Sequence, residues 1–128
     1  MGQAEINMSA FNRIIREIKS YWFAGKSGFH HGLGLKKARK GLHQQALKHF
    51  FLSIKCDEAS RIDNYEHSPI VLESIDKSYA HLKEWDKAKK YAEESLSGYN
   101  KMKDENDVIW QGGVNRINRL IKDINSLT

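Results

Sequence analysis

Cysteine and proline are nearly absent from this chain of 128 residues, which has one of each. The single Cys56 excludes an intramolecular disulfide and a zinc site built from several thiolates. Nothing therefore points to an oxidising compartment, and we expect a cytoplasmic protein. With one proline and nine glycines the chain is neither collagen-like nor low in complexity, and long helices are open to it.

Long apolar runs are missing as well. No stretch approaches the roughly 20 apolar residues that span a bilayer, and no basic segment followed by an apolar one marks an export signal. Gly2 follows Met1 as in a myristoylation site, but Ile6 stands where Ser or Thr is required. We therefore expect no membrane partner, and the length predicts a single domain over residues 1–128.

Motifs for catalysis, cofactors and metals are missing too. The run Gly25-Lys26-Ser27 matches the end of a phosphate-binding loop, but Ser20 stands where that loop needs its first glycine. The adjacent His30 and His31 point about 100° apart on a helix, which is not the spacing of a zinc-binding pair. We expect no catalytic residue, no cofactor and no bound metal, and thus no enzyme.

Acidic side chains are scarce in the first half of the chain. Residues 1–56 hold ten Lys or Arg against Glu5 and Glu17, whereas residues 57–128 hold eleven basic and fourteen acidic side chains. Such asymmetry favours acidic partners, nucleic acid included, although a solvated lysine-rich face is its ordinary alternative.

What the sequence has in abundance is helical periodicity. Apolar residues recur at spacings of three and four, and no segment alternates with a period of two, so we predict an all-α protein of about six helices. The run from Gly25 to Gly28 separates the first two, Ser27 caps the second, and Ser68-Pro69 starts the fourth. The expected helices cover residues 7–24, 28–40, 43–61, 69–82, 85–99 and 108–124.

The chain also resembles itself at an offset of 42 residues. In this register Leu33 falls on Ile75 and Ile54 falls on Leu96, so the helix-turn-helix unit recurs. The identical pairs between residues 27–68 and 69–110 are Ala38 and Ala80, Ala46 and Ala88, Lys48 and Lys90, Ser53 and Ser95, and Asn64 and Asn106.

The two copies resemble the tetratricopeptide repeat, whose first helix carries a large apolar residue, Leu-Gly and Tyr, and whose second helix carries Ala followed four residues later by an aromatic. The matching residues are Leu33, Gly34, Ala46 and Phe50 in the first copy, and Leu72, Ile75, Tyr79, Trp85 and Ala88 in the second. The chain departs from the family's pattern at three positions. In the first copy Lys37 stands where the pattern has tyrosine. In the second copy Asp76 stands where it has glycine, and Ala92 stands where it has an aromatic residue.

The resemblance covers about residues 27–110 and implies a right-handed superhelix of antiparallel helix pairs, in the extended variant with a repeat of 42 residues. Residues 1–26 are then an N-terminal capping helix, 27–68 the first repeat and 69–110 the second. Residues 111–128 form a partial third repeat or a C-terminal cap.

In this family the first helix of each pair lines a concave groove that binds a peptide or partner protein. Carried over by register, the lining is mostly basic and favours an acidic ligand. The expected groove residues are His31, Leu35, Ala38, Arg39, Glu73, Lys77, Ala80, His81, Asn115, Arg119 and Lys122. The family's chaperone-tail receptors carry Lys and Asn where this chain has His31 and Leu35, which argues against that ligand.

The leading expectation is thus a non-catalytic adaptor. One alternative is nucleic-acid binding through the basic residues 26–55, where Phe29, His30 and His31 lie among lysines. Another is self-association as a homodimer through Trp110 and the apolar stripe of the first helix.

Overall fold

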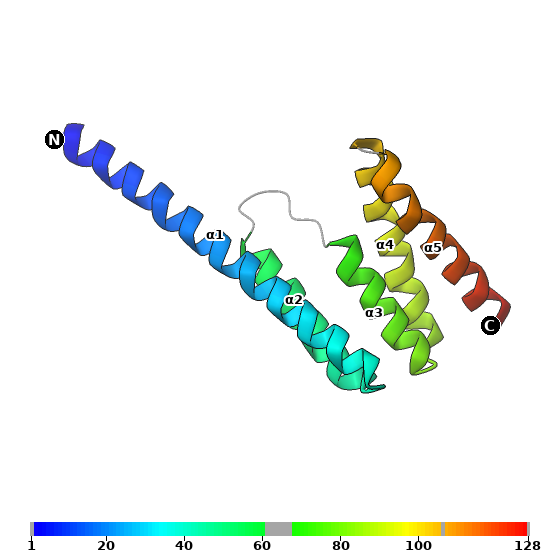
Figure 1. The fold of residues 1–128 in the computed structure, drawn as a ribbon. Helices are drawn as coiled ribbons and strands as arrows, with labels where there is room; N and C mark the ends of the chain where they lie inside the picture. The colour runs from blue at the N-terminus through cyan, green and yellow to red at the C-terminus, as the bar shows by residue number, and fades with distance from the viewer. Residues whose placement is uncertain (1, 61–67, 106, 128) are drawn as a thin grey trace.

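The computed structural model describes the backbone of residues 2–60, 68–105 and 107–127, and the side chains of residues 8–60, 68–102 and 110–127. Within these ranges the chain forms five helices and no strand, which confirms the all-α prediction (Figure 1). The helices are α1 (Gly2–Arg39), α2 (His43–Ser60), α3 (Pro69–His81), α4 (Trp85–Glu105) and α5 (Asp107–Leu127). None of them, over the described residues, is long and apolar enough to cross a membrane.

The predicted break at Gly25–Gly28 is wrong, because α1 is one helix of 38 residues. A glycine costs about 1 kcal/mol inside a helix, and contacts with α2 offset this cost. Ser27, expected to cap a new helix, instead binds Ser53: the Ser53 hydroxyl donates to its carbonyl at 2.8 Å, and the two hydroxyl oxygens lie 3.0 Å apart. The first two of the six expected helices are therefore joined, and the boundary expected at residue 27 falls inside α1.

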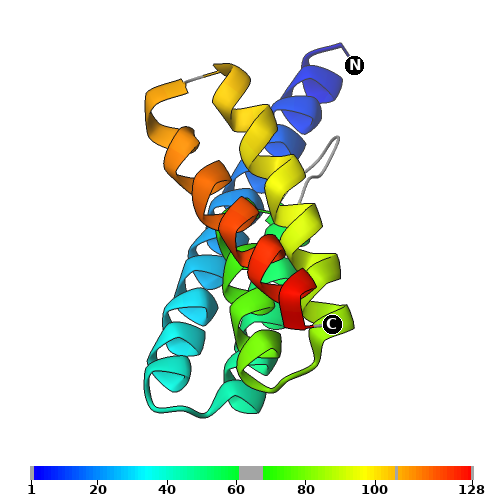
Figure 2. The same cartoon turned by 90° about the vertical axis from the view of Figure 1, so that its right-hand side faces the viewer.

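The helices pack as antiparallel neighbours in chain order (Figure 1). α1 lies along α2, α3 along α4 and α4 along α5, while contacts of α2 with α3 join the two groups. Seen from the side, α5 lies nearest the viewer, in front of α3 (Figure 2). The N-terminal part of α1 projects beyond the end of α2 (Figure 1).

The two hairpin turns have the same backbone structure at the 42-residue offset. Gly41 (φ 77°) ends α1 and Lys83 (φ 60°) ends α3, both in the left-handed conformation of a Schellman motif. In each turn two backbone N–H groups donate back into the last helical turn. These bonds are Gly41 to Ala38, Leu42 to Lys37, Lys83 to Ala80 and Glu84 to Tyr79, at 2.9–3.0 Å.

Contacts between paired helices recur at the same offset. The buried Ser53 hydroxyl donates to the Ser27 carbonyl, and the buried Ser95 hydroxyl donates to the Pro69 carbonyl at 2.7 Å. Ala46 and Ala88 are both fully buried, as their small size at a helix crossing predicts. The pair formed by Asn64 and Asn106 lies outside the described residues.

Contacts between successive first helices follow this register as well. His31 Nε2 on α1 lies 3.0 Å from Ser74 Oγ on α3, and Arg116 on α5 donates to Glu73 on α3 at 3.1 Å. The two contacts are equivalent at the 42-residue offset, because Glu73 lies 42 residues after His31 and Arg116 lies 42 residues after Ser74. The step from α1 to α3 thus resembles the step from α3 to α5.

Two apolar clusters form the core. The first joins α2 to α3, and the second joins α4 to α5. Their buried members are Ala46, Leu47, Phe50, Ile54, Val71, Leu72 and Ile75 in the first, and Ala92, Tyr99, Val114 and Ile117 in the second. Trp110, expected as part of a dimer surface, is half-buried with its ring centroid 5.9 Å from that of Tyr99.

Candidate functional site

Two hollows lie on either side of α3. The α1–α3 hollow has a volume of about 270 Å³ and is lined by Leu35, Ala38, Arg39, His43, Phe50, Ser74, Lys77, Ser78 and His81. The α3–α5 hollow has a volume of about 210 Å³ and is lined by Lys77, Ala80, His81, Trp85 and Leu120. Lys77 and His81 line both hollows, and we call the two hollows together the α3 groove.

Helical spacing places the side chains of this groove. Lys77 and His81 are four residues apart and so lie one above the other on the exposed face of α3, opposite the buried Leu72 and Ile75. Leu35 and Arg39 have the same spacing on α1 and precede them by 42 residues. The α1–α3 hollow therefore lies between two equivalent helix faces.

The structure brings together five of the eleven predicted groove residues at one hollow. The α1–α3 hollow is lined by Leu35, Ala38, Arg39, Lys77 and His81. The predicted Ala80 lines the α3–α5 hollow. His31 lies at its edge, where it contacts Ser74 and its ring centroid lies 5.6 Å from that of Phe50.

The three residues predicted on α5 line neither hollow. Asn115, Arg119 and Lys122 are exposed, and the Asn115 amide oxygen accepts a hydrogen bond from Gln111 at 2.8 Å. Leu120 lines the α3–α5 hollow instead, because residues adjacent in a helix point about 100° apart. The register was thus shifted by one residue on α5.

A carboxylate reduces the positive charge of the α3 groove. Lys77 Nζ lies 3.0 Å from an oxygen of Glu73, whose side chain is 7% exposed. Arg39 has no ion pair with any residue that the structure describes, and it stands in the last turn of α1 with Lys36 and Lys37. The cation available to a ligand is therefore at the α1 end of the groove.

Two imidazoles stack at that same end. The rings of His43 and His81 lie parallel, with centroids 4.3 Å apart and an interplanar angle of 4°. Burial lowers the pKa of His43, and the neighbouring His81 lowers it further. The lowered pKa keeps the His43 imidazole uncharged near neutral pH.

Sequence reasoning missed a buried polar network that fixes α3 against α4 and α5. The Tyr99 hydroxyl donates to Glu73 at 2.7 Å, and the Arg116 guanidinium donates to both Glu73 oxygens at 3.1 Å. Burial raises the pKa of Glu73, but hydrogen bonds from Arg116, Tyr99 and Lys77 outweigh this and hold the pKa below its ordinary value. The 26-residue spacing from Glu73 to Tyr99, which equals that from Ser27 to Ser53, was the available signal.

Asp76 is a second buried acidic residue on α3. The sequence predicted Glu73 in the groove, where it lines neither hollow, but did not single out Asp76 as a site. It is fully buried, and neither carboxyl oxygen has a hydrogen-bond partner among the described residues. Burial, with a contribution from Glu73, raises the pKa of Asp76 to about 8, and Lys77 opposes the shift. An acid with such a pKa suits proton transfer, but Asp76 lines neither hollow of the groove and so meets no ligand there.

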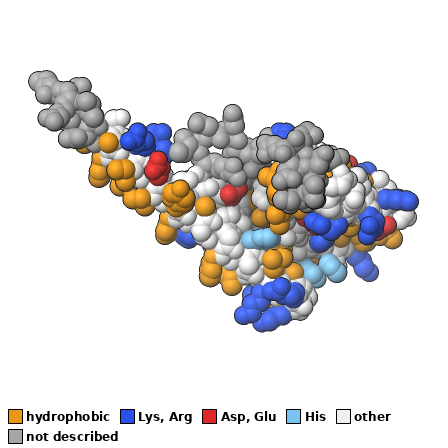
Figure 3. Space-filling view, turned by 45° about the horizontal axis from the view of Figure 1, so that its top comes forward, with side chains coloured by type: hydrophobic (Ala, Val, Ile, Leu, Met, Phe, Trp, Pro, Cys, Tyr) orange, Lys and Arg blue, Asp and Glu red, His pale blue; other side chains and the backbone are white. Residues whose placement is uncertain are grey.

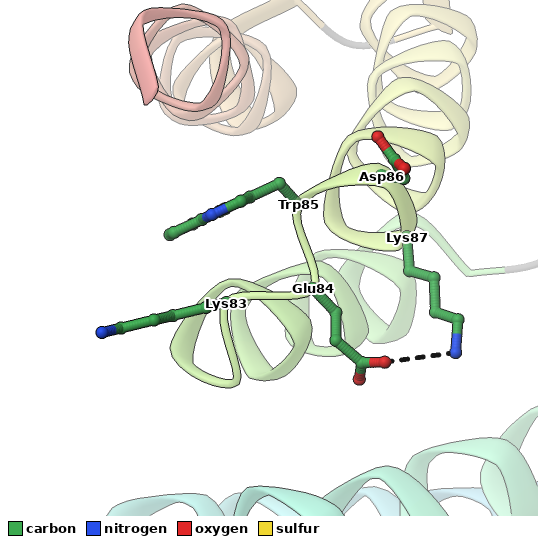
Figure 4. A pocket seen from close by; sticks show the side chains of 5 residues that line it. All are labelled: Lys83, Glu84, Trp85, Asp86 and Lys87. Carbon is green, nitrogen blue, oxygen red and sulfur yellow. Dashed lines mark hydrogen bonds and ion pairs between the residues drawn. The ribbon is translucent and has the colours of Figure 1, made fainter. Parts of the chain in front are cut away.

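A further hollow of about 360 Å³ lies at the turn between α3 and α4 (Figure 4). Lys83 and Trp85 extend from the turn in the same direction, while Lys87 Nζ meets Glu84 at 3.3 Å on another side. All five lining residues come from the turn and the start of α4, residues 83–87. It lacks walls from a second helix pair, so the α3 groove is the stronger candidate.

Two other residues considered in the sequence analysis, Lys26 and Cys56, lie outside both hollows of the α3 groove. Lys26 Nζ lies 4.3 Å from the Trp22 ring centroid within α1, and Cys56 is half-buried. Among the described residues, no three His, Cys, Asp or Glu side chains gather closely enough to hold a metal ion.

Comparisons of the chain with protein-family models, with curated proteins and with solved structures find no match.

Proposed function

We propose that this chain is a non-catalytic module that binds a segment of a partner protein in the α3 groove. The observation that carries the proposal is the pair Lys77 and His81, shared by two hollows that each have apolar walls. A ligand with an acidic residue between two apolar ones would place its carboxylate near these side chains and Arg39. Its apolar side chains would enter the hollows beside Leu35 and Trp85.

We also propose that the helix pairs follow the superhelical arrangement of tetratricopeptide repeats. The 42-residue offset supports it, since it relates the two turns, the two serine contacts and the two steps between first helices. In such an arrangement a groove formed by successive first helices is the ordinary binding surface for an extended segment.

The test is selection from a displayed library of random peptides, followed by fluorescence anisotropy with the selected peptides. We expect enriched sequences in which Asp or Glu lies between apolar residues. Leu35→Ser and Arg39→Gln should each weaken binding by about tenfold, on the order of 1.4 kcal/mol. Arg119→Gln is the matched control, because it removes an equal charge outside both hollows.

Failure to enrich any sequence, or equal affinity of the selected peptides for Leu35→Ser, would overturn the proposal. Binding to a labelled RNA or DNA oligonucleotide that falls steeply with salt, and that survives Arg39→Gln, would favour the basic region 26–55 instead.

A further inference from the structure

The N-terminal part of α1 carries an apolar face that no other helix covers. The Ser20 hydroxyl donates to the carbonyl of Ser60, the last residue of α2, at 2.7 Å, so residues before Ser20 lie beyond the α1–α2 hairpin (Figure 1). Hydrophobic side chains gather along one side of this projection (Figure 3). The exposed ones in the projection are Met8 (59%), Phe11 (56%), Ile14 (51%) and Ile18 (58%), and Tyr21 (79%) and Trp22 (57%) continue the face just after Ser20.

Four of these residues, together with the half-buried Ile15, have the spacing of a coiled coil. Steps of three and four residues alternate along the row Met8, Phe11, Ile15, Ile18 and Trp22. Two helices that pair along their length require this mean repeat of about 3.5 residues. We call this row the α1 seam.

The α1 seam lies on the side of α1 that faces away from α2. Ser20, Ser27 and Gly34 face α2, since they contact Ser60, Ser53 and Phe50. At about 100° per residue, Ser20 lies about 160° from both Ile18 and Trp22. A partner on the seam therefore leaves the fold and the α3 groove as they are.

We propose that a second copy of this chain binds the α1 seam, with the two α1 helices antiparallel. In that orientation Trp22 lies opposite Phe11 of the second copy, and Ile15 lies opposite its Ile18. Ile14 and Tyr21 flank the seam on one edge and face each other across the pair. Every contact along this edge and the seam is then apolar.

A parallel pair is the poorer fit. It would place Ile14 against Lys19 of the second copy, and it would bring both helical bodies to the same end of the pair. The antiparallel pair keeps those bodies at opposite ends. The asymmetry of the seam edges, with Ile14 and Tyr21 on one and Asn12 and Lys19 on the other, thus selects the orientation.

The exposed area is sufficient for a dimer of modest affinity. Side chains of this size, each about half exposed, present on the order of 600 Å² per copy, which is at the upper end for a patch on a monomer. Two copies would bury about 1,200 Å², the lower limit of specific protein interfaces.

Sedimentation velocity over a concentration series of the intact chain tests the association. We expect a reversible monomer–dimer equilibrium, and Ile18→Glu should abolish the dimer. Arg13→Glu is the matched control, because it adds the same side chain on the opposite face of α1 and should leave the dimer intact. Circular dichroism of both variants establishes that the helices remain.

Spin labels test the orientation. In a Cys56→Ser background, labels at Glu17→Cys should lie side by side, whereas labels at Ser9→Cys should be displaced along the axis by about 22 Å, at about 1.5 Å per residue. A parallel dimer would give similar distances at both sites and would overturn the pairing. A chain that stays monomeric, or that dimerises equally well as Ile18→Glu, overturns the proposal. The proposal is also overturned if the chain stays monomeric and sediments with anionic lipid vesicles, because the α1 seam then binds a lipid surface.

Discussion

At the residue scale, two side chains of the second hairpin stand where the first hairpin has glycine. Lys83 corresponds to Gly41 at the end of the first helix, and Asp76 corresponds to Gly34 at the helix crossing. Each replacement has a local cost: a left-handed backbone conformation for Lys83, and a buried carboxyl group without a hydrogen-bond partner among the described residues for Asp76. Both costs lead to predictions.

Replacing Lys83 by glycine should stabilise the protein. The left-handed conformation costs an L-residue about 1–2 kcal/mol, and the greater freedom of glycine in the unfolded chain returns part of it, so we expect a gain of about 0.5–1 kcal/mol. Urea denaturation measures the change. Gly41→Ala should have the opposite sign, and a loss of stability in Lys83→Gly would contradict the assigned turn.

Asp76→Asn should remove a pH dependence of stability. The pKa of Asp76 is about 8 in the folded chain and 3.8 in the reference state, so the folded chain retains a proton that the unfolded chain releases. The contribution of Asp76 to the free energy of unfolding is therefore largest below pH 3.8. It declines as the pH rises from 3.8 toward about 8.

The variant should therefore gain stability relative to the parent between these pH values, by on the order of 2 kcal/mol at neutral pH. Thermal melts across a pH series measure it. Asp123→Asn changes the net charge equally at an exposed position and should retain the parent's slope. Parallel curves for Asp76→Asn and the parent would show that Asp76 ionises normally.

At the scale of single elements, α1 shows how tertiary contacts decide the role of glycine. Gly28 lies in the uninterrupted helix with open space around its Cβ position, whereas a Cβ on Gly34 would clash with the Phe50 ring. The same substitution therefore has opposite consequences six residues apart.

Gly28→Ala should stabilise the protein by up to about 1 kcal/mol, because alanine favours the helical backbone. Gly34→Ala should destabilise it by about 1–3 kcal/mol through overpacking against Phe50. Denaturant midpoints with unchanged slopes measure both. A neutral or destabilising Gly28→Ala would indicate a helix break at 25–28, as the sequence predicted.

At the scale of the whole molecule, Glu73 connects three helices. Its carboxylate on α3 accepts hydrogen bonds from Tyr99 on α4 and Arg116 on α5. The same residue neutralises Lys77 at the α3 groove. The network therefore sets both the position of α5 and the charge of the candidate site.

Arg116→Met should destabilise the protein by about 1–2 kcal/mol, since Glu73 loses its bidentate partner while Arg116 itself is half exposed. Loss of that partner should also raise the pKa of Glu73. Urea denaturation and carboxylate NMR titration measure the two effects. Arg119→Met removes a guanidinium from the exposed face of α5 and should change neither.

Short-range patterns predicted the starts of α2 at His43, α3 at Pro69 and α4 at Trp85. The groove stripe implied by the repeat resemblance placed Leu35, Arg39, Lys77 and His81 on faces that meet at one hollow. It failed for α5, where a shift of one residue exchanged Leu120 for Arg119. Periodicity fixes a helix face only to within about one residue, since neighbouring side chains differ by about 100°.

Helix type, the turns before His43 and Trp85 and the 42-residue recurrence follow from the sequence alone, because residues within a few positions of each other determine backbone preference. Only the tertiary structure decided that α1 is continuous, that Glu73 is ionised in a buried network and that Asp76 retains its proton. These outcomes depend on Ser53, Arg116 and other side chains distant in the chain, whose proximity and desolvating effect arise only when the helices pack.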